Sequence, residues 1–335
     1  MRARCLPDAS CCFKLPKAAR AVPQPASREA PSESLEPLLP PPPPAPYSGS
    51  EVKRHRRKAG LSEGKSVPLE LGLAADVPEL RRRPFICAYY RMEPPTWRHF
   101  WCCHNETGNI WTHIVASALT VVRCMWWLSS WQQEAVLWYR YAVLAYFVGS
   151  LMTFCISVQY HWRLSTEDEG EFLCWMCLDQ SCCLALVMLG FFAGVPMGYH
   201  CFPELQRMYI VTSILVCIAM AAALMKIPKA RWDLIAAVII FGTGIGYVTP
   251  AIHWLVISEP GRRAVGSKLS AQIVMTGVAV IFYTRYIPER FAPGRFDLVG
   301  NSHQLWHVAI YLSIALYGEC LIQVNDLVDS GTFCI

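Results

Sequence analysis

Charged side chains are scarce in this 335-residue chain: they make up 16% of it, against about 25% in typical soluble domains. Hydrophobic residues make up 54%, above the roughly 45–50% of soluble domains. This balance excludes an ordinary soluble domain and predicts an integral membrane protein. The formal net charge of +5 is more typical of membrane topology and a basic tail near anionic lipid than of nucleic-acid binding, so we expect no nucleic-acid partner.

Long apolar runs are missing from residues 1–80, which instead hold an unbroken proline run at 40–44 and a basic cluster at 53–58. Such a segment cannot bury enough apolar surface to offset its ordering entropy, so it is predicted to be a disordered cytoplasmic tail. Nothing in its first thirty residues resembles the apolar core of a signal peptide, and we expect the first spanning helix to direct insertion. The proline run is compatible with docking of cytoplasmic signalling proteins or with a simple spacer.

Seven apolar runs follow, each near the roughly 20 residues that cross a hydrocarbon core. They lie at about 112–128, 139–160, 172–195, 208–225, 234–257, 270–286 and 303–322. The sequence therefore predicts an all-α membrane protein with a seven-helix transmembrane domain at 112–322. A juxtamembrane segment at 81–111 precedes this domain, and a short tail at 323–335 follows it.

Basic residues in the connections predict the orientation of the helices. From residue 81 onward, twelve Lys or Arg residues lie on the side that holds the N-terminus and five lie on the other side. Because positive charge resists translocation, this balance predicts a cytoplasmic N-terminus and a lumenal or extracellular C-terminal tail. A multi-pass protein of this kind fits the Golgi or the plasma membrane.

Three histidines fall at the predicted cytoplasmic ends of these spans. His303 and His307 are four residues apart, which puts both rings on one face of a helix, and His161 ends the second span. Asp179 lies roughly 10 Å into the third span, and Ser157 comes one turn before His161. Three histidine ligands with one open position are typical of catalytic zinc sites, so we predict a Zn²⁺ ion held by the three imidazoles at the cytoplasmic side.

Five further residues receive provisional roles around this ion. Asp179 would orient or deprotonate a metal-bound water, and Ser157 would hydrogen-bond the bound species or a substrate carbonyl. Glu106, Asn109 and His113 recur at helical spacing at the entrance to the first span, where they either support the ligands from behind or pack and hydrogen-bond the helix ends. The plainer alternative for the three ligand histidines is that they are interfacial polar groups satisfied by backbone and water, but their common depth favours a metal.

Cysteine is abundant, and the four cysteines between 174 and 183 suggest a second metal site. All four lie within one lipid-embedded helix, whereas a zinc ribbon needs two pairs on facing loops, so helix packing is the favoured interpretation. Cys201 and Cys334 both fall on the predicted lumenal side, where an oxidising compartment permits a disulfide, and the sequence leaves this pairing open. His253 falls on the same side and is expected to be structural.

Taken together, the polar residues form three short motifs: Glu106-x2-Asn109-x3-His113, Ser157-x3-His161 with Asp179 in the next span, and His303-x3-His307. These motifs resemble the signatures of the progestin and adipoQ receptor family, as does the connection at 288–303, and the resemblance covers about residues 84–322. It implies seven helices in the inverse of the G-protein-coupled receptor orientation, with zinc on His161, His303 and His307 and with Asp179 contacting the zinc-bound water. Related members are thought to hydrolyse the amide of ceramide or to act as receptors for hormones and lipids.

Two functions of different classes fit these expectations. The first is a zinc-dependent intramembrane hydrolase of a lipid amide, resembling a ceramidase, whose substrate is a membrane sphingolipid. The second is a hormone- or lipid-sensing receptor, or a membrane scaffold, in which zinc is structural and the N-terminal tail recruits cytoplasmic signalling proteins. Both functions need the same ligands, so the motifs alone do not separate them.

Overall fold

The computed structural model describes residues 69–130, 137–227 and 232–334. The predicted tail up to residue 68, with its proline run and basic cluster, lies outside the described residues. Residues 69–80 are described, and they contain strand β1 (Leu71–Leu73) followed by a 3-10 turn at Ala74–Asp76. Regular structure is therefore present within the segment that was predicted to be disordered up to residue 80.

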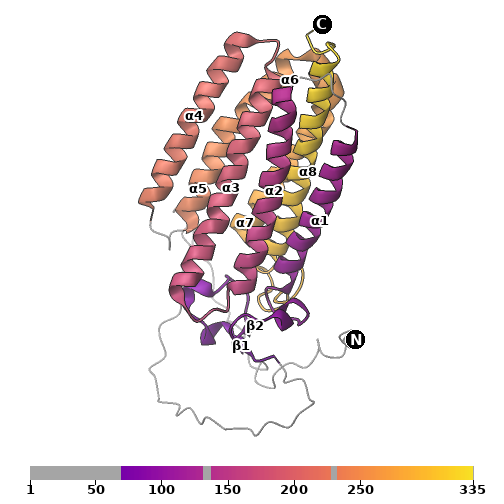
Figure 1. Cartoon of the computed structure of the whole chain (residues 1–335). Coiled ribbons are helices and arrows are strands. Elements are labelled where there is room, and N and C mark those ends of the chain that lie inside the picture. Colours follow the sequence, from indigo (N-terminus) through magenta and orange to yellow (C-terminus); the bar gives the residue numbers. More distant parts are fainter. Residues whose placement is uncertain (1–68, 131–136, 228–231, 335) are drawn as a thin grey trace, which may run out of the picture. The chain divides into compact units, whose positions relative to one another are not determined.

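Helices dominate the described residues (Figure 1). They are α1 (Thr107–Ser129), α2 (Leu137–Arg163), α3 (Glu169–Gly198), α4 (Pro203–Lys226), α5 (Trp232–Thr243), α6 (Thr249–Ile257), α7 (Glu259–Arg285) and α8 (Ser302–Asp329). A π-helical turn at Gly244–Val248 joins α5 to α6 without a break in helical backbone, so the two form one stretch.

Six helical stretches in the described ranges are long and apolar enough to cross a membrane: α2, α3, α4, the α5–α6 stretch, α7 and α8. They coincide with the second to seventh predicted spans. Helix α1 coincides with the first predicted span and has 23 residues, yet it is not among the six described candidates. Polar residues within it, among them Asn109, His113, Thr120 and Arg123, lower its average hydropathy. It packs against α2 and α8 (Figure 1).

Side-chain caps set where two of these helices begin. Asp168 accepts hydrogen bonds from the backbone N–H groups of Gly170 and Glu171, at 2.7 and 3.2 Å, and so starts α3. Asn301 accepts from the N–H of Gln304 at 3.1 Å and so starts α8. The Asn301 cap places the His-x3-His motif in the first two turns of α8.

The chain before α1 is tied to the connection before α8. Strand β2 (Ala88–Arg91) pairs with β1 in antiparallel fashion. The backbone N–H groups of Cys87 and Ala88 donate to the carboxylate of Asp297 at 3.0 and 2.8 Å. These bonds hold the two connecting segments together at the end of the bundle where α2 ends and α8 begins.

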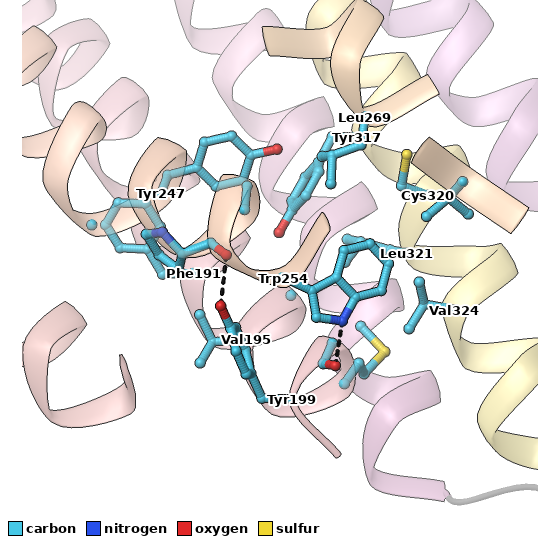
Figure 2. Close-up of a pocket in the computed structure, with 17 residues that line it drawn as sticks. Phe191, Val195, Tyr199, Tyr247, Trp254, Leu269, Tyr317, Cys320, Leu321 and Val324 are labelled. Carbon is cyan, nitrogen blue, oxygen red and sulfur yellow. Dashed lines mark hydrogen bonds between the residues drawn. The ribbon is translucent and has the colours of Figure 1, made fainter. Parts of the chain in front are cut away.

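At the other end of the helices, Cys201 and Cys334 form a disulfide, so the pairing that the sequence left open is present. The same half of the bundle holds an apolar cavity of about 60 Å³ (Figure 2). The Tyr199 hydroxyl donates to the carbonyl of Pro250 at 2.7 Å, and the Trp254 indole N–H donates to that of Gly198 at 2.5 Å. Because these polar groups bond to the backbone, the wall facing the cavity is almost wholly apolar.

Candidate metal centre

Three imidazoles from two helices converge at one end of the bundle. His161 lies in the last turn of α2, and His303 and His307 lie in the first turns of α8. One nitrogen of each ring lies within 4.8 Å of the others, and the ring centroids are 4.6 to 5.3 Å apart. His161 and His307 are buried, whereas His303 is half-buried. The structure thus brings together the three histidines that were predicted as metal ligands.

Hydrogen bonds at Nδ1 orient two of these rings. Nδ1 of His161 lies 2.9 Å from Oε2 of Glu106, and Nδ1 of His307 lies 3.0 Å from the hydroxyl of Thr112. Each ring can therefore offer Nε2 as the ligand atom. Partners of this kind behind a ligating histidine set its tautomer and hold its ring plane.

The donor set fits a zinc ion. Three neutral imidazole nitrogens are borderline donors that suit zinc, and they leave a tetrahedral position open. Nε2 of His307 is buried and has no hydrogen-bond partner among the described residues. Leaving such a nitrogen unpaired costs roughly 1–3 kcal/mol, and a cation between the three rings would remove that cost.

Asp179 and Ser157 lie beside each other on α3 and α2. The Ser157 hydroxyl is within hydrogen-bonding reach of the Asp179 carboxylate. Oδ1 of Asp179 is buried without a partner in the part of the chain that the structure describes. Within the same described residues, no hydrogen bond links Asp179 directly to the imidazoles. Ser157 is one helical turn before His161 on α2, and the unpaired oxygen of Asp179 on α3 is available to a ligand.

The carboxylate of Glu106 joins the first motif to the second. It accepts from Nδ2 of Asn109 at 2.7 Å and from Nε and Nη2 of Arg83 at 2.7 and 3.1 Å, in addition to its bond with His161. Burial favours the neutral carboxyl, but Arg83 and His161 outweigh burial and hold the pKa of Glu106 well below its usual range. Glu106 is therefore an anion directly behind His161, with Asn109 as its second support.

His113 reaches the site by stacking. Its ring lies almost parallel to that of His307, with centroids 3.7 Å apart and planes inclined by 19°. Neither of its nitrogens has a hydrogen-bond partner among residues 69–130, 137–227 and 232–334. His113 thus packs against a ligand ring, as a supporting residue would, and stays outside the converging set of three.

Three residues that contact the candidate site were not predicted from the sequence as site residues. Arg83 was counted only as one of the basic residues that set topology, and Arg91 was treated in the same way. Thr112 stands inside the first motif but has no charge or ring to draw attention to it. It follows Asn109 by three residues, so it shares a helix face with that motif residue, and this was the available signal.

The apolar helices and the buried imidazole cluster define a multi-pass integral membrane protein with a candidate metal centre. The chain belongs to the haemolysin-III related family, whose model matches residues 101–317, and within it to the progestin and adipoQ receptor group. The match includes all three motifs, so the resemblance seen in the sequence is confirmed.

Several relatives are similar over most of this chain. Progestin and adipoQ receptor family member 3 of Mus musculus is 27% identical over 263 residues, which cover 73% of this chain and 82% of the relative. Heptahelical transmembrane protein 1 of Arabidopsis thaliana is 27% identical over 279 residues, covering 76% and 82%. The adiponectin receptor protein of Drosophila melanogaster is 26% identical over 245 residues, covering 67% and 54%. The chain thus spans about half the length of the fly relative, as it does of a nematode relative.

Proposed function

We propose that this protein is a zinc-dependent intramembrane hydrolase of a lipid amide, with ceramide-like sphingolipids as the substrate class. The observation that carries the proposal is the convergence of three imidazole nitrogens within 4.8 Å of one another. Structural zinc sites are normally closed by four protein ligands, whereas catalytic sites use three and keep one position open. A set of three therefore favours chemistry at the metal.

The residues around the three histidines can supply the other groups that amide hydrolysis needs. When bound, zinc supplies a Lewis acid that polarises a carbonyl and lowers the pKa of a coordinated water. Asp179 offers its unpaired Oδ1 to accept a proton and to return one to the leaving amine, while Ser157 steadies the carboxylate. Glu106 holds the Nδ1 proton of His161, so that Nε2 of this ring faces the ion.

Seven spans form part of this proposal, with α1 as the first. Large apolar side chains are exposed along one face of α1 at helical spacing, as expected for a lipid-facing stripe: Val115, Leu119, Val122, Met125 and Trp126. The polar residues of α1, such as His113 and Thr120, are buried. The name of the heptahelical Arabidopsis relative agrees with seven spans.

The proposed orientation puts the metal centre on the cytoplasmic side. It is supported by the excess of basic residues on the side of the N-terminus. The Cys201–Cys334 disulfide adds independent support, because disulfides persist in oxidising compartments and this one lies at the end of the helices away from the histidines. A site at membrane depth suits a substrate that stays in the bilayer.

The second candidate is a receptor for a hormone or lipid, with a structural zinc ion. The observation that favours it is the naming of the fly relative as an adiponectin receptor. In this case the N-terminal tail would recruit cytoplasmic signalling proteins, and Asp179 would have no catalytic task.

Turnover by the purified full-length chain separates the two functions. We expect ceramide hydrolysis that falls by 100-fold or more in Asp179→Asn, with zinc content unchanged. The control is Asp326→Asn, which alters an exposed carboxylate near the other end of α8 and should leave turnover intact. Full zinc occupancy without hydrolysis of any sphingolipid would refute the hydrolase and favour the receptor.

A further inference from the structure

We propose that Arg83, in the segment before the first helix, is a positioning residue that holds His161 in its metal-binding orientation through Glu106. This inference rests on the proposed metal site. It assigns the segment before α1 a direct part in building the centre.

Arg83 and Glu106 form an ion pair with two points of contact. Nε of Arg83 lies 2.7 Å from Oε1 of Glu106, and Nη2 lies 3.1 Å from Oε2. This two-point contact fixes both the place and the plane of the carboxylate, which a single contact would not do. The same Oε2 lies 2.9 Å from Nδ1 of His161, so the imidazole is held against a carboxylate that cannot turn.

Both side chains of this ion pair are largely buried. The Glu106 side chain is only 4% exposed, and that of Arg83 is 19% exposed. A buried carboxylate is stable as an anion only while it is paired and hydrogen-bonded. Loss of Arg83 would leave the Glu106 carboxylate without its two-point partner and free to rotate toward water. Rotation moves away the acceptor that fixes the Nδ1 proton of His161, and the direction of Nε2 is lost with it.

The same segment also holds the backbone of His161. Arg91, eight residues after Arg83, donates to the carbonyl of His161 at 2.7 Å and to that of Trp162 at 2.8 Å. The last carbonyls of a helix lack intrahelical partners, and a cation bonded there is stabilising. One short segment thus holds His161 at two points: its ring through Arg83 and its backbone through Arg91.

This segment also contacts the connection that leads to the other two candidate ligands, His303 and His307. Asp297, in the connection before α8, accepts from the backbone of Cys87 and Ala88. The segment at 83–91 therefore bridges the end of α2 and the start of α8, the two helices that carry the imidazoles. Its role is to set the spacing of ligands that come from separate helices.

Metal affinity of the purified full-length chain tests this role without reliance on turnover. We expect Arg83→Gln to weaken zinc binding by about 10- to 100-fold in a chelator competition, the usual loss when a partner behind a ligand is removed. The visible spectrum of the cobalt-substituted protein should change as well, because it reports the geometry of the ligands. The matched control is Arg82→Gln, since Arg82 donates instead to the carbonyls of Val77 and Ala75.

A double-mutant comparison shows whether Arg83 acts through Glu106. Glu106→Gln alone should weaken zinc binding, and Arg83→Gln added to it should change the affinity by less than about twofold. Fully additive losses would overturn the proposed route. If Arg83→Gln does not give folded protein, Arg83→Lys decides, since it keeps the charge but loses the two-point contact. Weaker zinc binding in folded Arg83→Lys supports the proposal, and unchanged binding refutes it.

The outcomes separate this inference from the proposed function. A wild-type protein that binds no zinc would refute the metal site itself. Zinc-loaded wild type with an unchanged affinity in folded Arg83→Gln would refute the positioning role alone.

Discussion

The carboxylate of Glu106 shows how single residues build the candidate centre. A guanidinium, two side-chain amides and an imidazole all bond to its two oxygens. Each bond compensates part of the cost of burying the charge. Removing one partner therefore destabilises the buried carboxylate and loosens its bonds to the remaining partners. The affinity of the proposed centre for zinc would therefore depend on more residues than the three candidate ligands.

The metal assignment predicts the zinc content of four histidine variants. The purified protein should carry about one zinc, and His161→Ala, His303→Ala and His307→Ala should each strip it, because two imidazoles bind far more weakly than three. His253→Ala is the control, since its ring bonds instead to the hydroxyl of Tyr209 at 2.6 Å. Elemental analysis measures the zinc, and stoichiometric zinc retained in all three ligand variants would end the assignment.

Two other buried histidines, His99 and His104, are expected to make the stability of the folded protein sensitive to acid. Burial, reinforced by nearby Arg91, lowers the pKa of His104 to about 3 and that of His99 to about 4. Both are ordinarily near 6.5, so the unfolded chain binds protons that the folded chain does not. Their contribution to stability is complete above pH 6.5 and is lost progressively as the pH falls toward these lowered values.

His104→Gln tests this effect, because Gln keeps a donor for the carbonyl of His99 but does not titrate. Relative to wild type, the variant should lose about 2 kcal/mol less stability between pH 7 and about pH 5. Thermal unfolding at the two pH values measures the difference. Equal acid sensitivity in the two proteins would show that His104 is not the responsible group.

Among the elements, α1 and α8 come into close contact where each of them begins. A Cβ atom on Gly108 would lie 2.4 Å from the side-chain amide of Gln304. That amide accepts from the N–H of Gly300 and donates to the carbonyl of Leu298, so it braces the turn that leads into α8. The glycine inside the first motif therefore lets α1 approach the helix that carries two ligands.

We predict that Gly108→Ala destabilises the protein by roughly 1–3 kcal/mol, because the Gln304 side chain must move and lose these bonds. Gly277→Ala is the matched control in α7. A Cβ there meets no atom within 4 Å among the described residues, so this change should be neutral or slightly stabilising. Thermal unfolding midpoints compare the two, and equal effects would contradict the close approach of α1 and α8.

For the molecule as a whole, the orientation in the membrane decides which compartment the centre faces. An acceptor sequon added after Ile335 on a polar linker should be glycosylated, and one added within the first 50 residues should not, because oligosaccharide transfer is lumenal. The natural sequon at Asn105 should stay unmodified, since it lies in the proposed cytoplasmic segment. Glycosylation of the N-terminal sequon alone would invert the orientation and move the centre to the lumenal side.

Much of this protein follows from local features of its sequence. The predicted runs from 139 onward coincide with described helices because length and apolar composition are properties of a continuous segment. His303 and His307 share a face because four residues make about one helical turn. The sequence also placed His161 at the same end of the bundle, since helices that alternate in direction return every second connection to one side.

Tertiary structure alone decided how these residues are held. Glu106 and His161 are 55 positions apart, Thr112 and His307 are 195 apart, and Cys201 and Cys334 are 133 apart. Such contacts depend on how the helices rotate and pack against one another, and no periodicity within a single segment encodes that rotation. Arg83 is the clearest case: in the sequence it is one of three consecutive basic residues, and only folding buries it against the carboxylate behind His161. The sequence alone does not distinguish a basic residue that only flanks a membrane span from one that forms a buried ion pair in a site, because the partner of the second is brought near only by folding.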